Sequence, residues 1–380
     1  MSVETFRRAF AADPGLVHLN NAGLSPASLP ARDAVIRWAG RYAAEGVFCG
    51  GDYLRAVKAA RESLARLFDA DPGEIAFFPS TAGAVSQVAF GIGLRPGDEV
   101  VTWDQEYGSN LHPWREAAAE AGARLVVVPS GPDLATPAER ILDALTPRTR
   151  AIGISWVQYR AGSVTELGPI VAEARRRRIW TVLDVIQGVG ALPFSFRSLG
   201  VDAVCGGSHK WLAAPIGAGY LCLRADRIGE LRPRAVGAHT YGTSEDIPKL
   251  DPSLRADARR FEPGSLPVLE IIALGASVDL LLEAGIAAVS AEALRLSELL
   301  AGGLRALGYR VAAPNGPVQR TPIVTFAPGE GSPMKSIDAV AAALTRRKVA
   351  FAIRDPGIRL SPHAHNGDGD IARALEALGR

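Results

Sequence analysis

Short apolar runs rich in β-branched residues alternate with segments of helical spacing from about Glu74 onward, and this alternation constrains the fold more than any other feature. The helix-like segments include Trp114–Ala121, Ala138–Leu145 and Leu167–Arg178. The apolar runs, each expected to be a strand, are Ile75–Phe78, Val100–Trp103, Leu125–Val128, Ala151–Ile154, Trp180–Leu183, Ala203–Cys205 and Tyr220–Leu223. Strands that alternate with helices build a mostly parallel sheet covered on both faces, so the sequence predicts an α/β fold.

The pattern changes in the second half of the chain. Leu231–Pro267 is rich in Pro and Arg and lacks periodicity, which is typical of a crossing or subunit-contact segment. The strongly apolar Val268–Ala284 has the spacing of a long helix. A second alternating set follows, with helices Ala291–Leu307 and Ser336–Arg346, strands near Tyr309–Val311 and Ile323–Phe326, and a last helix ending at Leu378.

The length of 380 residues exceeds one average domain, so we expect a large domain and a smaller one that share an interface. We place an N-terminal segment that packs on the small domain at residues 1–20. The large domain is expected at residues 21–265, and a small C-terminal α+β domain at residues 266–380.

Charge and composition exclude several classes of protein. The net charge is +2, and the one basic run, Arg175–Arg178, stands directly before the apolar Ile179–Val182. Cations at this point suit the C-terminal end of a helix that leads into a strand, so no nucleic-acid partner is expected. The first residues lack the apolar core of a signal sequence, and no window reaches the roughly 18 apolar residues of a membrane span.

The cysteines indicate the compartment. Cys49, Cys205 and Cys222 are too few for a disulfide framework in a chain of this length, and they lack the close spacing of a zinc site. We therefore expect a cytoplasmic protein with no metal, no membrane and no nucleic acid among its partners.

Two charged residues follow neighbouring predicted strands. Asp184 ends the run Val182–Leu183, and Lys210 comes a few residues after Ala203–Cys205. Ligands of such sheets bind beyond the carboxyl ends of the strands, so both side chains should point into one crevice. A lysine in a desolvated pocket can form a Schiff base with an aldehyde, and a carboxylate can pair with a pyridinium nitrogen. Taken singly, Asp184 could cap a helix and Lys210 could be a solvated surface lysine.

The sequence context decides between these interpretations. A series of motifs runs along nearly the whole chain: His18–Pro26, Ser80–Ala84, Glu106–Tyr107 with Asn110–Trp114, Asp184–Gln187, Ser208–Leu212, Arg260–Ser265 and Arg359–Ser361. In this order they resemble the class V aminotransferase family of fold-type-I pyridoxal-phosphate (PLP) enzymes, which includes cysteine desulfurases, selenocysteine lyases and isopenicillin-N-epimerase-like proteins. The resemblance implies a large domain with a mostly parallel sheet of seven strands and a smaller C-terminal α+β domain.

The resemblance also implies roles around the PLP ring. Lys210 would hold the cofactor as a Schiff base and, once released by the substrate amine, would remove the substrate's α-proton. Asp184 would keep the ring nitrogen protonated, which makes the ring an electron sink. Gln187 would hydrogen-bond the phenolic oxygen, Tyr107 would stack on the ring, and His209 would help to seat it. The alternative for Tyr107 is a tyrosine that only packs at the end of the sheet.

Phosphate binding is expected at the small-residue run Ser80–Ala84. This run stands between a predicted strand and a helix, where free N–H groups and the positive end of the helix dipole suit an anion. The resemblance favours Thr81 together with Ala82 or Gly83 as the ligands. An ordinary N-cap fits the same residues and can be present at the same time.

Two further serines are candidates for the phosphate. Ser208 is one, although desulfurases place their serine one position earlier, where this chain has Gly207. Ser265 resembles a hydroxyl that reaches the phosphate of the neighbouring subunit's cofactor. The resemblance therefore implies a homodimer with shared sites.

Substrate contacts are expected from three parts of the chain. Arg359 resembles the arginine that clamps the substrate's α-carboxylate, for which its planar fork is suited, and a salt bridge on the small domain is the alternative. Asn21 and Ala22 belong to the segment that passes beside the substrate in the family. Gln158 and Arg160 lie where a substrate side chain would reach, and Arg160 could suit an acidic group or be a solvated loop residue.

The sequence departs from the desulfurase pattern at one place. A cysteine desulfurase needs a nucleophilic cysteine on a mobile loop upstream of the carboxylate-binding arginine. Lys348–Arg359 contains no cysteine and leaves no room for that loop. Cys205 and Cys222 lie in apolar runs, and Cys49 fits packing or a loop role. Persulfide chemistry is therefore disfavoured.

The leading hypothesis is an aminotransferase of class V type that acts on an amino acid or an amino-acid-derived metabolite. One alternative is a lyase that expels a β-substituent, for example by cleavage of a C–S bond. Another is an epimerase, which needs a second acid that the sequence does not identify. A PLP-binding regulator is weak because such regulators carry an added DNA-binding module, for which Met1–His18 is too short. An idle scaffold is weak because Asp184, Lys210 and Arg359 form a complete set.

Overall fold

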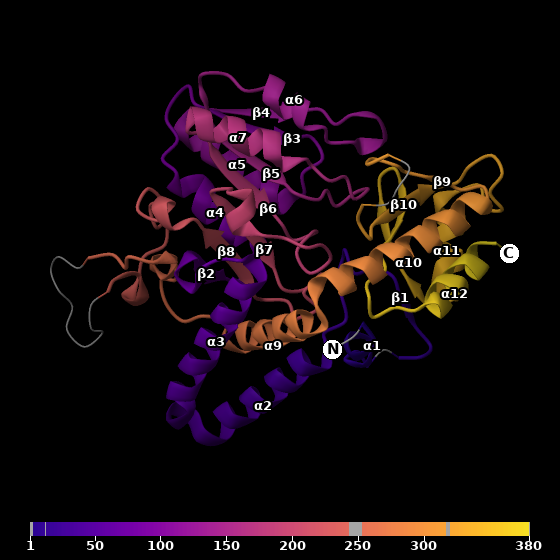
Figure 1. The fold of residues 1–380 in the computed structure, drawn as a ribbon, viewed down its shortest axis with the longest axis horizontal. Coiled ribbons are helices and arrows are strands. Elements are labelled where there is room, and N and C mark those ends of the chain that lie inside the picture. The colour runs from indigo at the N-terminus through magenta and orange to yellow at the C-terminus, as the bar shows by residue number, and fades with distance from the viewer. Residues whose placement is uncertain (1–2, 12, 243–252, 317–319, 380) are drawn as a thin grey trace.

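A seven-stranded sheet forms the centre of the protein in the computed structural model, which describes residues 3–11, 13–242, 253–316 and 320–379 (Figure 1). The strand order is β2-β8-β7-β6-β5-β3-β4, in which β8 runs antiparallel to both neighbours and β7, β6, β5, β3 and β4 are parallel. The strands are β2 (Ile75–Phe78), β3 (Glu99–Trp103), β4 (Arg124–Val128), β5 (Thr149–Ser155), β6 (Trp180–Asp184), β7 (Ala203–Gly207) and β8 (Gly219–Leu223). Each contains the run predicted for it, so the predicted α/β fold is confirmed.

Alternate residues of each strand pack on opposite faces of the large sheet. In β3, Val100 joins the apolar core beneath α4 (Thr81–Gly91) and α5 (Gly108–Ala121), whereas Val101 joins the core on the other face. The helices on that other face include α6 (Ala138–Asp143), α7 (Leu167–Arg177) and α8 (Phe196–Leu199). Because both faces are covered, the strands are continuous apolar runs.

The smaller domain is built on a four-stranded antiparallel sheet of order β12-β13-β10-β9. Its strands and helices are β9 (Arg310–Val311), β10 (Val324–Ala327), β11 (Val349–Ala350), β12 (Ala352–Arg354), β13 (Gly357–Leu360), α10 (Ile286–Ala306), α11 (Ile337–Arg346) and α12 (Asp368–Leu378). Leu300, Leu344 and Ile371 of the helices meet Phe326 and Ile358 of the sheet in one core. The predicted α+β character of this part is therefore confirmed.

The N-terminal segment touches both domains. After the short helix α1 (Val3–Arg8), β1 (Val17–His18) pairs in parallel with β11 of the small domain. The backbone N–H of Ala22 then donates to Ser361 Oγ at 3.0 Å, directly after β13. A few residues later the N–H of Ser25 donates to the carbonyl of His209 in the large domain at 2.9 Å. One continuous stretch of backbone thus connects the two domains beside their junction.

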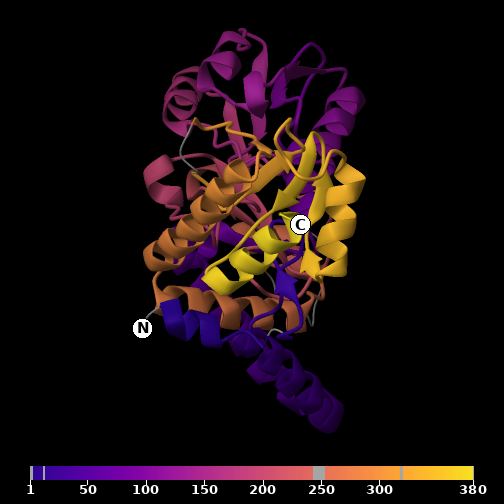
Figure 2. The same cartoon turned by 90° about the vertical axis from the view of Figure 1, so that its right-hand side faces the viewer.

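Three helices form the base of the molecule. α9 (Val268–Ala284) packs against α2 (Leu29–Glu45) and α3 (Gly50–Phe68) and shares the apolar core of the large sheet. The residues of α9 share the core of the large sheet, although α9 follows residue 266, where the small domain is expected to begin. The ends of α2 and α3 that meet near Gly46 extend beyond the contact with α9, away from the rest of the molecule, and α2 and α3 together are called the arm, residues 29–68 (Figure 2).

The predicted irregular stretch Leu231–Pro267 is described in part. It contains two short 3-10 helices, Ala238–Thr240 and Ala258–Phe261, while its residues 243–252 lie outside the described residues. Within the described ranges, no single helix has the length and hydropathy needed to cross a membrane. α9 and α10 meet that test only as a pair, and they are bent by 85° relative to each other.

Candidate active site

One cavity of about 170 Å³ collects residues that follow the carboxyl ends of β2, β3, β5, β6 and β7. This convergence is expected because parallel strands end at the same edge of a sheet. The predicted site residues that line the cavity are Ala22, Thr81, Ala82, Tyr107, Asp184, Gln187, His209, Lys210 and Arg359. Residues from six separate motifs therefore share one space.

Asp184 and Lys210 form the charged centre of the cavity. Asp184 is only 3% exposed, and its Oδ1 accepts a hydrogen bond from the backbone N–H of Ile186 at 2.9 Å. Burial raises the pKa of Asp184 and lowers the pKa of Lys210, whose shift is partly opposed by the Asp184 charge. A lowered pKa increases the neutral fraction of the lysine, which is the form that attacks an aldehyde.

Two tyrosines form a wall next to the lysine. Nζ of Lys210 lies 5.7 Å from the ring centroid of Tyr107, and Tyr159 meets Tyr107 edge-on with centroids 5.1 Å apart. Tyr107 is 49% exposed, so it faces the cavity and is not a core packing residue. The preceding Glu106 is buried and accepts hydrogen bonds from the backbone N–H of Ser155 at 2.7 Å and from its hydroxyl, which anchors this segment to β5.

The first turn of α4 forms the opposite end of the cavity. Ser80 Oγ accepts a hydrogen bond from the N–H of Gly83 at 3.2 Å, so the expected N-cap is present and the Gly83 N–H is occupied. The N–H groups of Thr81 and Ala82 have no intrahelical acceptor, because they belong to the first turn. Thr81 Oγ1 is buried without a hydrogen-bond partner. These donors fit an anion.

Gln187 is held in one orientation. Its Nε2 donates to the carbonyl of Ala22 at 2.9 Å, and its Oε1 accepts from the indole Nε1 of Trp211 at 3.0 Å. One N–H of the amide is left for the cavity. Burial, followed by the charge of Lys210, lowers the pKa of His209 to about 4, so this ring is neutral at physiological pH.

These groups fit the PLP cofactor that the sequence predicts. Lys210 supplies the amine nucleophile, and Asp184 supplies the acceptor for a protonated ring nitrogen. Thr81 Oγ1 is a buried polar atom that still lacks a partner at the anion-binding end. The cavity therefore has a complementary group for each end of the cofactor.

Arg359 is a buried cation on the small-domain side of the cavity. It is 1% exposed, and its Nη1 donates to the carbonyl of Tyr159 at 2.7 Å. Its Nε has no partner, and no ion pair joins it to a carboxylate in the described part of the chain. Burial, with a further contribution from the charge of Arg354, lowers the pKa of Arg359 to about 9. The alternative of a small-domain salt bridge is therefore not observed among the described residues.

Three predicted site residues point away from the cavity. Asn21 is fully buried and donates to the carbonyl of Ser361 at 2.8 Å. Gln158 donates from Nε2 to Glu106 at 2.6 Å. Ser208 is buried, and its hydroxyl hydrogen-bonds to the carbonyl of Pro215, which disfavours Ser208 as a phosphate ligand. Each of these side chains forms hydrogen bonds to residues around the cavity and none points into it.

Two more predicted site residues, Arg160 and Ser265, also lie outside the cavity. Arg160 forms an ion pair with Asp355 and also donates from Nε to the Asp355 carbonyl at 2.9 Å, so it is fixed to the small-domain hairpin. Ser265 is exposed and does not line the cavity of its own chain. Sequence reasoning did not single out Arg354, which does line the cavity.

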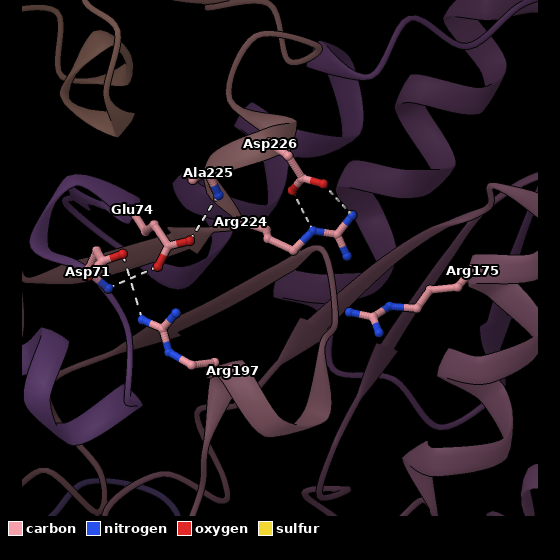
Figure 3. Close-up of a pocket in the computed structure, with 7 residues that line it drawn as sticks. All are labelled: Asp71, Glu74, Arg175, Arg197, Arg224, Ala225 and Asp226. Atoms are coloured by element: carbon pink, nitrogen blue, oxygen red, sulfur yellow. Dashed lines mark hydrogen bonds and ion pairs between the residues drawn. The ribbon is translucent and has the colours of Figure 1, made fainter.

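A wider hollow of about 580 Å³ lies at the edge of the large sheet where β2 begins and β8 ends. Figure 3 shows the residues that line it. Its charges neutralise one another: Arg224 pairs with Asp226, and Nη2 of Arg197 lies 3.7 Å from Asp71. Such surface pairs contribute little binding energy and suit a structural role. Within the described ranges, no cluster of three or more His, Cys, Asp or Glu side chains could hold a metal ion.

Comparisons with known proteins agree on the family. The model of the Aminotransferase class-V family matches residues 34–357. Isopenicillin N epimerase of Streptomyces clavuligerus is 29% identical over 395 aligned residues, which cover 99% of this chain and 97% of the relative. A probable cysteine desulfurase of Methanothermobacter thermautotrophicus is 30% identical, and the alignment covers 79% of this chain and 75% of the relative.

Solved structures of similar fold include C-DES. A lysine-to-alanine mutant of C-DES, with glycine covalently linked to its PLP cofactor, matches with a TM-score of 0.90 and 24% identity over 98% of each chain. A second structure, of the cystine C-S lyase C-DES with its product cysteine persulfide, has a TM-score of 0.89 and 24% identity and covers 96% of this chain and 98% of that one. At this identity the likeness concerns the fold.

Proposed function

Because this chain belongs to the class V aminotransferase family of PLP-dependent enzymes, we propose that it transaminates an amino acid or an amino-acid-derived metabolite. Lys210 would bind PLP covalently through its amine and would move the substrate's α-proton. The observation that carries the proposal is the position of Lys210 in one cavity with Asp184 and Arg359. When bound, PLP supplies the electron sink for the negative charge that develops at the substrate's α-carbon.

We assign the other cavity residues to binding and orienting the substrate and the cofactor. Arg359 takes the α-carboxylate through its free donors, which turns the α-hydrogen toward Nζ of Lys210. Asp184 would keep the ring nitrogen protonated, and Gln187 would donate its remaining amide N–H to the phenolic oxygen. Tyr107 would stack on the ring, and the first turn of α4 would hold the phosphate.

Lys210 is the one lysine of the described cavity lining, and a single amine base favours transamination over epimerisation. For transamination, Lys210 would remove the proton from the substrate's α-carbon and deliver one, on the same face, to the cofactor carbon that is bonded to the substrate nitrogen. An epimerase instead needs a second acid on the opposite face of the α-carbon. Among the described residues that line the cavity, none is a cysteine. The β12–β13 hairpin turns within two residues, Asp355 and Pro356, which leaves no loop for a desulfurase cysteine.

The test is to incubate the purified holoenzyme with a panel of amino acids and 2-keto acids and to identify products by mass spectrometry. Keto-acid formation that depends on an added amino acceptor supports the proposal. Pyruvate and ammonia formed without an acceptor would establish a lyase. Loss of chirality without keto acid would establish an epimerase, and either result overturns transamination.

The role of Lys210 has its own test. Borohydride reduction of the holoenzyme should fix PLP on the peptide that contains Lys210, and Lys210→Ala should lose the Schiff-base absorbance band. Lys335→Ala, which changes an exposed lysine of the small domain, should keep both signals. Modification of another peptide would contradict the assignment.

We further propose a homodimer in which a second copy covers the arm of α2 and α3. Val47 and Phe48 at the tip of the arm are 85% and 91% exposed, which is unusual for adjacent large apolar side chains. The exposure of Ser265 is compatible with a reach into the partner's cavity. In analytical ultracentrifugation, Phe48→Asp should shift the dimer toward monomer, whereas Leu299→Asp, on α10, should not. A wild-type monomer would overturn this proposal.

The cysteines bear on the compartment. Cys49, Cys205 and Cys222 are buried and unpaired, which supports the prediction of a reducing cytoplasm.

A further inference from the structure

A second arginine, Arg354, lines the same cavity as Arg359. The two stand on adjacent strands of the β12–β13 hairpin, where Ala352 pairs with Arg359 and Arg354 pairs with Gly357. Side chains that are directly opposite or two positions apart point to the same face of a sheet. Arg354 and Arg359 are therefore diagonal neighbours on one face, roughly 7–8 Å apart at the backbone.

No carboxylate in the described part of the chain pairs with Arg354. Its Nε is buried without a partner, and its Nη1 donates to the carbonyl of Ile353 at 2.7 Å. The adjacent carboxylate, Asp355 at the hairpin turn, is engaged by Arg160. Arg354 therefore keeps its charge and most of its donors for the cavity.

The charges around the cavity suit a substrate with two anionic groups. Arg359 also lacks a carboxylate partner among the described residues, and its free Nε suits the α-carboxylate. The charge of Arg354 contributes to the lowered pKa of both Lys210 and Arg359, which places it near these groups. Asp184, the one acidic residue of the described cavity lining, is committed to the ring nitrogen. A substrate with one carboxylate would leave Arg354 as an uncompensated, partly desolvated cation.

We propose that Arg354 binds an anionic group on the substrate's side chain, so that the preferred substrates are α-amino acids with an acidic side chain. The inference rests on the proposed function, since it assumes an amino acid held at Arg359 by its α-carboxylate. Arg160, for which the sequence left open an acidic substrate group or a solvated loop position, is instead engaged in an ion pair with Asp355. Its contribution is to hold the hairpin that carries Arg354.

The test compares isosteric pairs, aspartate with asparagine and glutamate with glutamine, on the wild-type holoenzyme, Arg354→Gln and Arg354→Lys. Two readouts are taken: kcat/KM for keto-acid formation, and the dissociation constant from the change in Schiff-base absorbance. Ile353→Gln, an exposed neighbour on the other face of β12, is the matched control. A retained Schiff-base band shows that each variant is folded and loaded.

We expect the wild type to bind the acidic member of at least one pair more tightly by about 10- to 100-fold, the range for a charge-assisted hydrogen bond. Arg354→Gln should abolish that preference and leave the amide member unchanged within about twofold, and Arg354→Lys should restore part of it. Equal binding of acids and amides by the wild type, or an equal loss for both in Arg354→Gln, would overturn the inference. Arg354-dependent binding without keto acid would overturn transamination and leave the inference intact.

Discussion

Two residues of the cavity, Asp184 and Thr81, should affect different properties of the enzyme when they are replaced. Asp184, which we propose acts on the cofactor ring, is 3% exposed, so its charge is weakly screened by solvent. Thr81 contributes a hydroxyl whose oxygen is buried without a partner. The first residue should therefore affect the chemical step, and the second the retention of the cofactor.

Asp184→Asn should lower kcat by at least about 100-fold, because the neutral amide cannot stabilise a protonated ring nitrogen. The Schiff base should still form, since Lys210 is unchanged. Single-turnover kinetics and absorbance spectra measure the two effects. Asp202→Asn removes another buried carboxylate, at the amino end of β7, and should leave kcat per loaded site unchanged. A comparable loss of kcat in that control would show that Asp184 acts only through stability.

Thr81→Ala should weaken PLP binding by about tenfold, the value of one hydrogen bond to a charged group. The dissociation constant can be measured by fluorescence during dialysis against PLP-free buffer. Thr81→Ser keeps the hydroxyl and should bind PLP as the wild type does. If Ser and Ala behave alike, the hydroxyl of Thr81 does not hold the phosphate.

At the scale of elements, a buried ion pair ties α3 to the edge of the large sheet. Arg61 and Glu262 are 8% and 7% exposed and form two hydrogen bonds of 2.8 and 3.0 Å. Glu262 also accepts from the backbone N–H of Phe77 in β2 at 2.7 Å, and Arg61 donates to the carbonyl of Ile75 at 2.6 Å. Loss of one partner would leave the other charge buried without compensation.

Glu262→Gln should therefore lower the free energy of unfolding by about 3 kcal/mol. Glu62→Gln, which breaks the exposed pair with Lys58 on the same helix, should change it by less than about 0.5 kcal/mol. Denaturant unfolding of both variants measures the difference. A loss of similar size in the two would argue against a special role of the buried pair.

The strands were predictable because they are buried on both faces and form continuous apolar runs. α2 and α3 were not predicted, although the buried residues of α3, such as Leu64 and Phe68, recur at the spacing of an amphipathic helix. α5 begins at Gly108, six residues before the predicted Trp114, although Pro113 removes one N–H from it.

The site was predictable as far as it depends on strand ends and family motifs. Asn21 and Gln158 do not line the cavity, because their side chains hydrogen-bond to Ser361 and Glu106, whereas the adjacent Ala22 and Tyr159 line it. Arg354 could not be identified from sequence, since its importance depends on which partner Asp355 takes in three dimensions.

At the scale of the whole molecule, three histidines lie where the N-terminal segment meets both domains. Nε2 of His363 is 3.1 Å from the carbonyl of Trp211, Nε2 of His365 is 2.9 Å from Oδ1 of Asn21, and the His18 ring is near His365. Burial lowers the pKa of His363 to about 4. Burial, then repulsion by neighbouring charges, lowers the pKa of His365 as well.

Acid should destabilise the protein through these histidines. Both are neutral when folded, whereas in the unfolded chain they bind protons below their ordinary pKa of about 6.5. The unfolded state therefore takes up more protons as pH falls from about 6.5 toward 4, and stability decreases by up to about 1.4 kcal/mol per pH unit for each histidine. In thermal unfolding, His363→Gln with His365→Gln should show a smaller decrease between pH 7 and pH 5 than the wild type. An unchanged pH dependence would contradict this assignment.

The backbone from β1 to Ser25 connects the part of the small domain that carries Arg359 with the loop that carries Lys210. It is bonded on one side to Ser361, two residues from Arg359, and on the other to His209, which is adjacent to Lys210. A rotation of the small domain must carry or stretch this backbone. We therefore expect that binding of a carboxylate at Arg359 can shift the loop that carries Lys210, because one hydrogen-bonded segment connects the two.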